Sequence, residues 1–192
     1  MRVGVLAMVV SVALTPATAN AQAFGIRIGD NISNYKVISR SRNFYVVSPP
    51  IPHEKLESYF ALTAPDGEIC SVSGAGQTIV NDMSGARSRD EYGYWTQALI
   101  RKYGKPSTNH DFITPDATFS HKNDFKQALQ DKVRTLSTFW FAKDGALLTQ
   151  DVSSIWLDMK GFSYGTFISL NYEGRNFVDC SERSLNDRDA GL

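Results

Sequence analysis

The chain has few of the residues that build metal and redox sites, and no excess of charge. Its 192 residues include two cysteines and three histidines, and no Cys-x-x-Cys spacing occurs. The sequence therefore predicts no metal site of the zinc-cluster type and no cofactor. Twenty Lys and Arg residues balance 20 Asp and Glu residues. A near-neutral chain without a basic stripe is not expected to bind nucleic acid.

Long apolar runs are also missing, except near the N-terminus. The uncharged run Val3–Leu14 is 12 residues long, too short to cross a bilayer as a helix. It follows Arg2 and precedes the small residues of Ala19-Asn20-Ala21. This order is typical of a secretory signal peptide, the alternative being a buried N-terminal core element. We predict a signal peptide at residues 1–21, with an alternative end at 23, and a periplasmic or extracellular location.

What remains after cleavage at Ala21 is 171 residues with one net negative charge. This length suits one domain with a substantial core, which we place at residues 22–184. The polar segment 185–192 is expected to be a frayed tail. No later segment is apolar enough to span a bilayer, so no stable membrane anchor is expected in the mature chain.

Strand signals fall into two groups along the chain. The turn residues Pro65-Asp66-Gly67 predict a hairpin between strands at 59–64 and 68–73. Alternating patterns predict further strands at 24–28, 36–39, 44–48, 136–142, 154–160 and 166–172.

Helical periodicity is clearest between the two groups of strands. Ser88 and Glu91 form a capping-box pattern ahead of a helix that runs to Tyr103. A second helix is predicted at 123–134, and a short one at 176–182. The segment 105–122 is either a functional loop or contains a short strand near Phe112.

These elements predict an α+β fold. We expect a mainly antiparallel sheet, built from two blocks of hairpins and packed against two amphipathic helices.

Cys70 and Cys180 are the two thiols of the chain. An even count in an exported protein favours a disulfide, which would close a loop of about 110 residues. Two free buried thiols are the alternative. A reactive thiolate is not favoured, because no histidine lies near either cysteine in the sequence.

Four polar residues at the two ends of the 105–122 segment suggest a catalytic hypothesis. His110 and Asp111 lie near its start, and His121 and Asp124 near its end. Two imidazoles and two carboxylates are the groups of a zinc or acid–base site. The alternative is that they are ordinary surface residues, because their spacing matches no catalytic motif.

Aromatic residues suggest a surface instead. Ile155, Leu157 and Met159 share one face of their strand, so Trp156 has the opposite parity. Phe167 differs in the same way from Ile168 and Leu170, and Trp140 from Phe139 and Phe141. If Trp140, Trp156 and Phe167 coincide, they form a patch that the helix ending at Tyr103 covers or that binds a sugar or a partner protein.

One resemblance spans most of the mature chain. A strand Cys in Glu68-Ile69-Cys70, a helix ending Lys102-Tyr-Gly-Lys-Pro106 and a late Cys180 resemble features of small exported bacterial proteins with no assigned function. Glu68 stands where those proteins have glycine, and the resemblance implies no activity. We predict a non-enzymatic binding or interaction module of the cell envelope with an unidentified protein or carbohydrate partner. The alternative is a small hydrolase or metal-dependent enzyme that uses the His110/His121 segment.

Overall fold

The computed structural model describes residues 23–189 and has the mixed α+β composition that the sequence predicts. The signal peptide predicted at 1–21 lies outside these residues, as do residues 190–192 of the predicted tail, whereas residues 185–189 belong to the last helix. The strands are β1 Lys36–Ser41, β2 Phe44–Ser48, β3 Leu56–Thr63, β4 Ile69–Gly76, β5 Thr108–Ile113, β6 Arg134–Phe141, β7 Val152–Phe162 and β8 Gly165–Gly174. The helices are α1 Ala86–Tyr103, α2 Phe119–Asn123, α3 Phe125–Gln130 and α4 Phe177–Asp189, with 3-10 turns η1 Ile32–Asn34 and η2 Ala142–Asp144.

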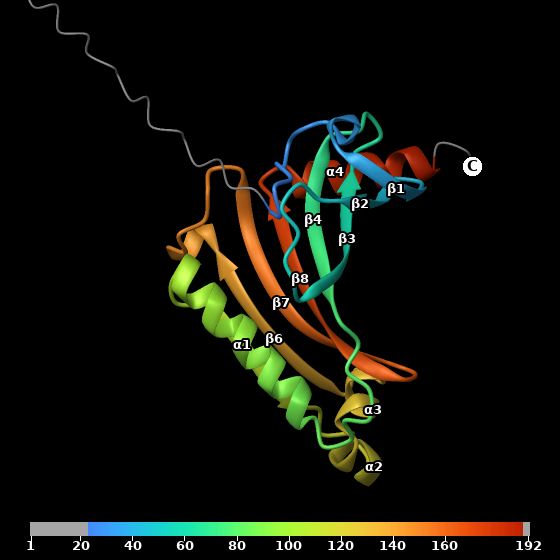
Figure 1. The fold of residues 1–192 in the computed structure, drawn as a ribbon, viewed down its shortest axis with the longest axis vertical. Coiled ribbons are helices and arrows are strands. Elements are labelled where there is room, and N and C mark those ends of the chain that lie inside the picture. The colour runs from blue at the N-terminus through green and yellow to red at the C-terminus, as the bar shows by residue number, and fades with distance from the viewer. Residues whose placement is uncertain (1–22, 190–192) are drawn as a thin grey trace, which may run out of the picture.

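All described strands belong to one antiparallel sheet, in the order β1-β2-β3-β4-β8-β7-β6-β5 (Figure 1). Strands β4 and β8 join its two halves, with Ser73 opposite Asn171. Helix α1 lies along the β6–β7 half, and α4 packs on β3 and β4 near the other edge. None of the described helices has the length and apolar content needed to cross a bilayer.

The β3–β4 hairpin turns where the sequence predicts it. Gly67 has a φ of +88°, a value that its lack of a side chain permits. The backbone N–H of Ala64 donates to the carbonyl of Glu68 at 2.9 Å and closes the turn. This hairpin places Cys70 in the second residue of β4.

Helix α1 forms near its predicted position, but the predicted capping box is wrong. The Ser88 side chain is buried two residues inside the helix, and its hydroxyl donates to Asp82 at 2.7 Å. The Asp82 carboxylate also accepts the backbone N–H of Ser88 at 2.8 Å, which caps the first turn from the preceding loop. Glu91 instead accepts the indole N–H of Trp95 at 2.9 Å.

Three other local predictions need correction. No strand forms at 24–28, because Phe24 and Gly25 both have positive φ and form a turn. The helix predicted at 123–134 is two short helices, α2 and α3, since Asp124 has extended backbone and caps α3. Strand β6 already begins at Arg134, two residues before its predicted start. Segment 105–122 contains β5, which confirms the alternative of a short strand near Phe112.

Helix α1 covers what we call the core face of the sheet, which carries Ile155, Leu157 and Leu170. The Tyr92 hydroxyl lies 2.7 Å from the hydroxyl of Thr138 at the centre of this contact. Burial raises the pKa of Tyr92, so the phenol stays neutral. Helix α3 covers the far end of the same face, where its backbone lies on Gly161. Both helices therefore pack on the core face of β7.

Candidate functional site

The opposite side of the sheet carries a row of side chains that we call the Trp156 face. Directly paired residues on neighbouring strands point to the same side of a sheet. The row runs through six paired strands and consists of Val46, Phe60, Ser73, Asn171, Trp156 and Phe139. All its members are half-buried, whereas Leu157, the core-face neighbour of Trp156, is fully buried. The Trp156 face is therefore partly open to solvent across the sheet.

Three aromatic rings at the β6–β7 end of this face are nearly parallel. The Phe139 centroid lies 6.2 Å from that of Trp156, at an interplanar angle of 14°. It lies 5.8 Å from that of Phe141, at 17°. Phe167 lies on the same face of β8, opposite Lys160, and contacts the edge of Phe162. Stacked rings of this kind are held by packing and give a rigid apolar surface.

Lysines lie over two of these rings. Lys160 Nζ is 5.6 Å from the Trp156 centroid, and Lys143 Nζ is 5.3 Å from the Phe141 centroid. Lys160 also lies 2.7 Å from the buried carboxylate of Asp158, which accepts a hydrogen bond from Ser137. A buried carboxylate needs such partners, since an unpaired one would be strongly destabilising. Lys160 is thus fixed by an ion pair, whereas Lys143 forms none within residues 23–189.

The side chains at the centre of the Trp156 face are polar, and most of them are small. The Asn171 amide donates to the Ser169 hydroxyl at 3.0 Å. The polar side chains that β4 and β8 contribute to this face are Ser71, Ser73, Ser169, Asn171 and Glu173. Their hydroxyl, amide and carboxylate groups provide hydrogen-bond donors and acceptors beside the aromatic rings.

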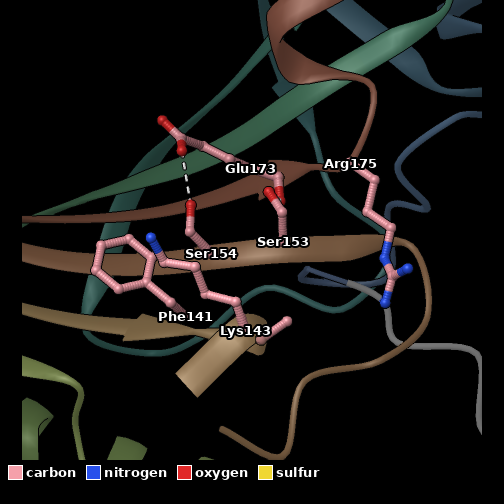
Figure 2. A pocket seen from close by; sticks show the side chains of 7 residues that line it. Phe141, Lys143, Ser153, Ser154, Glu173 and Arg175 are labelled. Carbon is pink, nitrogen blue, oxygen red and sulfur yellow. Dashed lines mark hydrogen bonds between the residues drawn. The ribbon is translucent and has the colours of Figure 1, made fainter. Parts of the chain in front are cut away.

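A cavity of about 560 Å³ opens at one end of this face, between η2 and the ends of β7 and β8. Figure 2 shows the Glu173 carboxylate above the strand, where it accepts the Ser154 hydroxyl at 2.6 Å. Lys143 and Phe141 lie together at one end of the cavity, and the Arg175 guanidinium lies at the other. Arg175 is exposed and forms no ion pair within the described part of the chain.

Trp140 does not lie on this surface. The predicted Trp140–Trp156–Phe167 cluster is therefore wrong with respect to Trp140. Trp140 pairs with Ile155 and lies fully buried on the core face. Its indole N–H donates to the carbonyl of Gly104 at the end of α1, at 2.9 Å. Side chains alternate along β6 as predicted, but only the β6–β7 register shows that Phe139, not Trp140, lies beside Trp156.

The residues of the hydrolase hypothesis have separate structural partners. His110 is opposite Ser137 on the Trp156 face, and its ring contacts Phe139 with centroids 5.8 Å apart. Asp111 points to the other side of β5 and accepts hydrogen bonds from Arg89 and Arg134, each at 3.0 Å. The strand therefore separates these two sequence neighbours.

The other two loop residues organise the α2–α3 junction. His121 accepts the N–H of Thr118 through Nδ1 at 3.1 Å, and its Nε2 lies 2.9 Å from the Asp131 carboxylate. Hydrogen bonds from Gln127 and from His121 lower the pKa of Asp131. Asp124 caps α3 by accepting the N–H of Gln127. The described residues contain no group of three or more His, Cys, Asp or Glu side chains placed to hold a metal ion.

The predicted cysteine pair does come together. Cys70 and Cys180 are joined as a disulfide, with 6.0 Å between their Cα atoms, and both are fully buried. The bond fastens α4 to β4. Close by, Arg183 of α4 contacts Asp66 at 2.8 Å and Glu68 at 2.7 Å.

Several residues of the site were not predicted as site residues. In the sequence, Phe139 and Phe141 stand out only as neighbours of Trp140, and the cavity residues Lys143, Glu173 and Arg175 belong to no motif. A signal existed in the alternation of Phe139 and Phe141, but it needs the register with Trp156 to have meaning.

No protein-family model, curated protein or solved structure matches this chain. The geometry of the Trp156 face is therefore the basis for a functional assignment.

Proposed function

We propose that this protein is an exported, non-enzymatic binding module that uses its Trp156 face to bind glycans of the cell envelope. The observation that carries the proposal is the half-buried stack of Phe139, Trp156 and Phe141 beside a small polar strip. It lies on the side of β7 that α1 and α3 leave uncovered.

The chemistry of a sugar fits this combination. A pyranose presents C–H groups on its faces, which pack on aromatic rings, and hydroxyl groups around its edge. Those hydroxyls need donors and acceptors close to the rings, as Asn171 and Glu173 provide. A row of paired strands also offers several such groups in line, which suits an oligosaccharide rather than a single small molecule.

The composition of the face favours a glycan over a protein partner. The centres of protein–protein interfaces are poor in serine, lysine and glutamate. Here Ser71, Ser73 and Ser169 occupy the centre of the face, and Lys143 and Lys160 lie over the rings. A partner protein would have to desolvate these groups without the flexible hydroxyl partners that a sugar supplies.

Export is supported by two features. The charge, apolar run and small residues of the N-terminus follow the order of a signal peptide. The Cys70–Cys180 pair is of the kind that persists in oxidising compartments. The hydrolase alternative gains no comparable support, because His110, Asp111, His121 and Asp124 have structural partners in separate places.

Binding of a neutral oligosaccharide by the mature protein tests the proposal. We expect titration with a β-1,4-linked N-acetylglucosamine tetramer to show saturable binding by calorimetry. Trp156→Ala should weaken it at least about tenfold, which corresponds to about 1.4 kcal/mol of lost stacking. Phe119→Ala is the matched control, because Phe119 is 84% exposed on α2, away from the face. Equal binding by wild type and Trp156→Ala would contradict the proposal.

A further inference from the structure

We infer that the preferred glycan is acidic, with carboxylate groups that the Lys143 and Arg175 end of the Trp156 face recognises. This inference rests on the proposed function and specifies its ligand. It starts from the cavity between η2 and the ends of β7 and β8, where the polar and aromatic parts of the face meet.

Two cations line this cavity from different elements. Lys143 comes from η2, and Arg175 follows the end of β8. Both are exposed, and neither forms an ion pair within residues 23–189. In contrast, Lys160 on the same face is paired with Asp158 at 2.7 Å. The cavity therefore presents two positive groups that remain available to an anion.

The one acid of the cavity is bound to Ser154 and lies away from Arg175. Glu173 accepts the Ser154 hydroxyl at 2.6 Å, and Figure 2 shows its carboxylate directed away from Arg175. The cavity lining keeps one net positive charge when Glu173 is ionised. Glu173 then serves as an acceptor for sugar hydroxyls, while the cations at the two ends select for anionic substituents.

The spacing of the cations favours a polymer of acidic units over a single anion. Lys143 and Arg175 lie at opposite ends of the cavity, with Phe141 beside Lys143 (Figure 2). One small anion would meet one of them. An oligosaccharide of uronic acids repeats its carboxylates along the chain, so it can meet both while one ring packs on Phe141.

The test compares an acidic and a neutral ligand on the same protein. Mature wild-type protein is titrated with a galacturonate tetramer and with the N-acetylglucosamine tetramer, at low and at high salt. We expect about fivefold or greater preference for the uronate at low salt, which falls at high salt. The Lys143→Gln/Arg175→Gln double variant should lose this preference and retain neutral binding. Lys122→Gln is the control for charge alone, because Lys122 is exposed on α2 outside the cavity.

The outcomes separate this inference from the proposed function. Equal affinity for both sugars, or a preference unchanged in the double variant, overturns the acidic-glycan inference and leaves glycan binding standing. Absence of binding to both sugars overturns the two together. The acidic-glycan inference and the proposed function are both supported if Trp156→Ala binds neither sugar and the double variant loses only its preference for the uronate.

Discussion

Two tryptophans on neighbouring strands have opposite surroundings, and their variants should behave differently. Trp140 is fully buried and donates to Gly104, whereas Trp156 is half-buried on the opposite face. We expect Trp140→Phe to lower the free energy of unfolding by about 1–3 kcal/mol, from lost volume and a carbonyl left without its donor. Trp156→Phe should change it by less than about 1 kcal/mol. Urea denaturation monitored by circular dichroism measures both, and equal losses would contradict the assignment of faces.

The contrast also shows how far single residues could be predicted. Alternation along β7 separates Trp156 from Ile155 and Leu157, and that division holds in the structure. Alternation cannot say which parity of β6 faces the core, because a shift of one residue exchanges the two sides. Phe139 and Trp140 are both large aromatic residues, so hydrophobicity does not indicate which of them faces the core. The register of β6 with β7 decides it.

Asp82 gives a residue-scale prediction about pH. Partial burial raises its pKa, but hydrogen bonds from the Ser88 hydroxyl and from the N–H groups of Ser88 and Arg87 lower it overall, below 3.8. A carboxyl pKa that is lower in the folded than in the unfolded state stabilises the protein at pH values above the unfolded-state pKa. This stability is lost as the pH falls through the folded-state pKa. Asp82→Ala should cost about 1 kcal/mol at pH 7, as for other lost helix caps.

The difference between wild type and Asp82→Ala should shrink as the pH falls below about 5, because the carboxyl of the unfolded chain then takes up a proton before that of the folded chain. Urea titrations at pH 7, 5, 4 and 3 measure it. Asp90→Ala is the control, since Asp90 is exposed on the same helix and caps nothing. A gap that stays constant down to pH 3 would show that the Asp82 charge does not stabilise α1.

At the scale of elements, local sequence signals predicted which helices and strands exist better than they predicted where these begin and end. The hairpin at Pro65–Gly67 and the body of α1 follow from turn residues and from periodic apolar side chains. The α1 cap was missed because its acceptor, Asp82, lies four residues before the helix begins. The α2–α3 break was missed because Phe125 and Leu129 suit one continuous helix, while the Asp124 side chain starts a new one.

Contact between α3 and β7 predicts opposite effects for two glycine substitutions. A Cβ on Gly161 would lie 2.6 Å from the backbone nitrogen of Gln130 and 2.7 Å from Leu129 Cβ. Gly161→Ala should therefore destabilise the protein by about 1–3 kcal/mol, because α3 must move off the strand. Gly93 lies inside α1 with nothing within 4 Å of such a Cβ. Gly93→Ala should stabilise by about 0.5–1 kcal/mol.

Thermal unfolding of the two glycine variants beside wild type measures both effects. Because the substitutions are chemically identical, a shared effect of adding a methyl group cancels in the comparison. If Gly161→Ala were as stable as Gly93→Ala, the close packing of α3 on β7 would be wrong.

At the scale of the whole molecule, the sequence predicted the class and left the topology open. Hairpins pair strands that are neighbours in the chain, and turn residues reveal them. The pairing of β4 with β8 joins Ser73 to Asn171, and no local pattern records a contact of that separation. The Trp156 face depends on it, because the polar strip combines β4 and β8. The binding surface could therefore be found only after the sheet was assembled.

The disulfide ties the same distant parts together and gives the last prediction. Cys70 and Cys180 are 110 residues apart, so their bond limits the unfolded chain over more than half its length. Chain entropy for such a loop corresponds to about 4–5 kcal/mol, and measured values are typically 2–4 kcal/mol. Because both cysteines are fully buried, the protein should be reduced while unfolded in urea and then refolded with reductant present. We expect unfolding at lower urea concentration under these conditions and a mass gain of two hydrogens.

The Cys70→Ala/Cys180→Ala variant separates loss of the bond from other effects of the reductant. Its unfolding should occur near that of the reduced wild type and should not respond to reductant. Loss of the bond should act first on α4, which the disulfide fastens to β4, and leave α1 on the core face. Hydrogen exchange should therefore rise in α4 before it rises in α1. Equal protection of α4 with and without the bond would show that Arg183 and its contacts with Asp66 and Glu68 suffice to hold the helix.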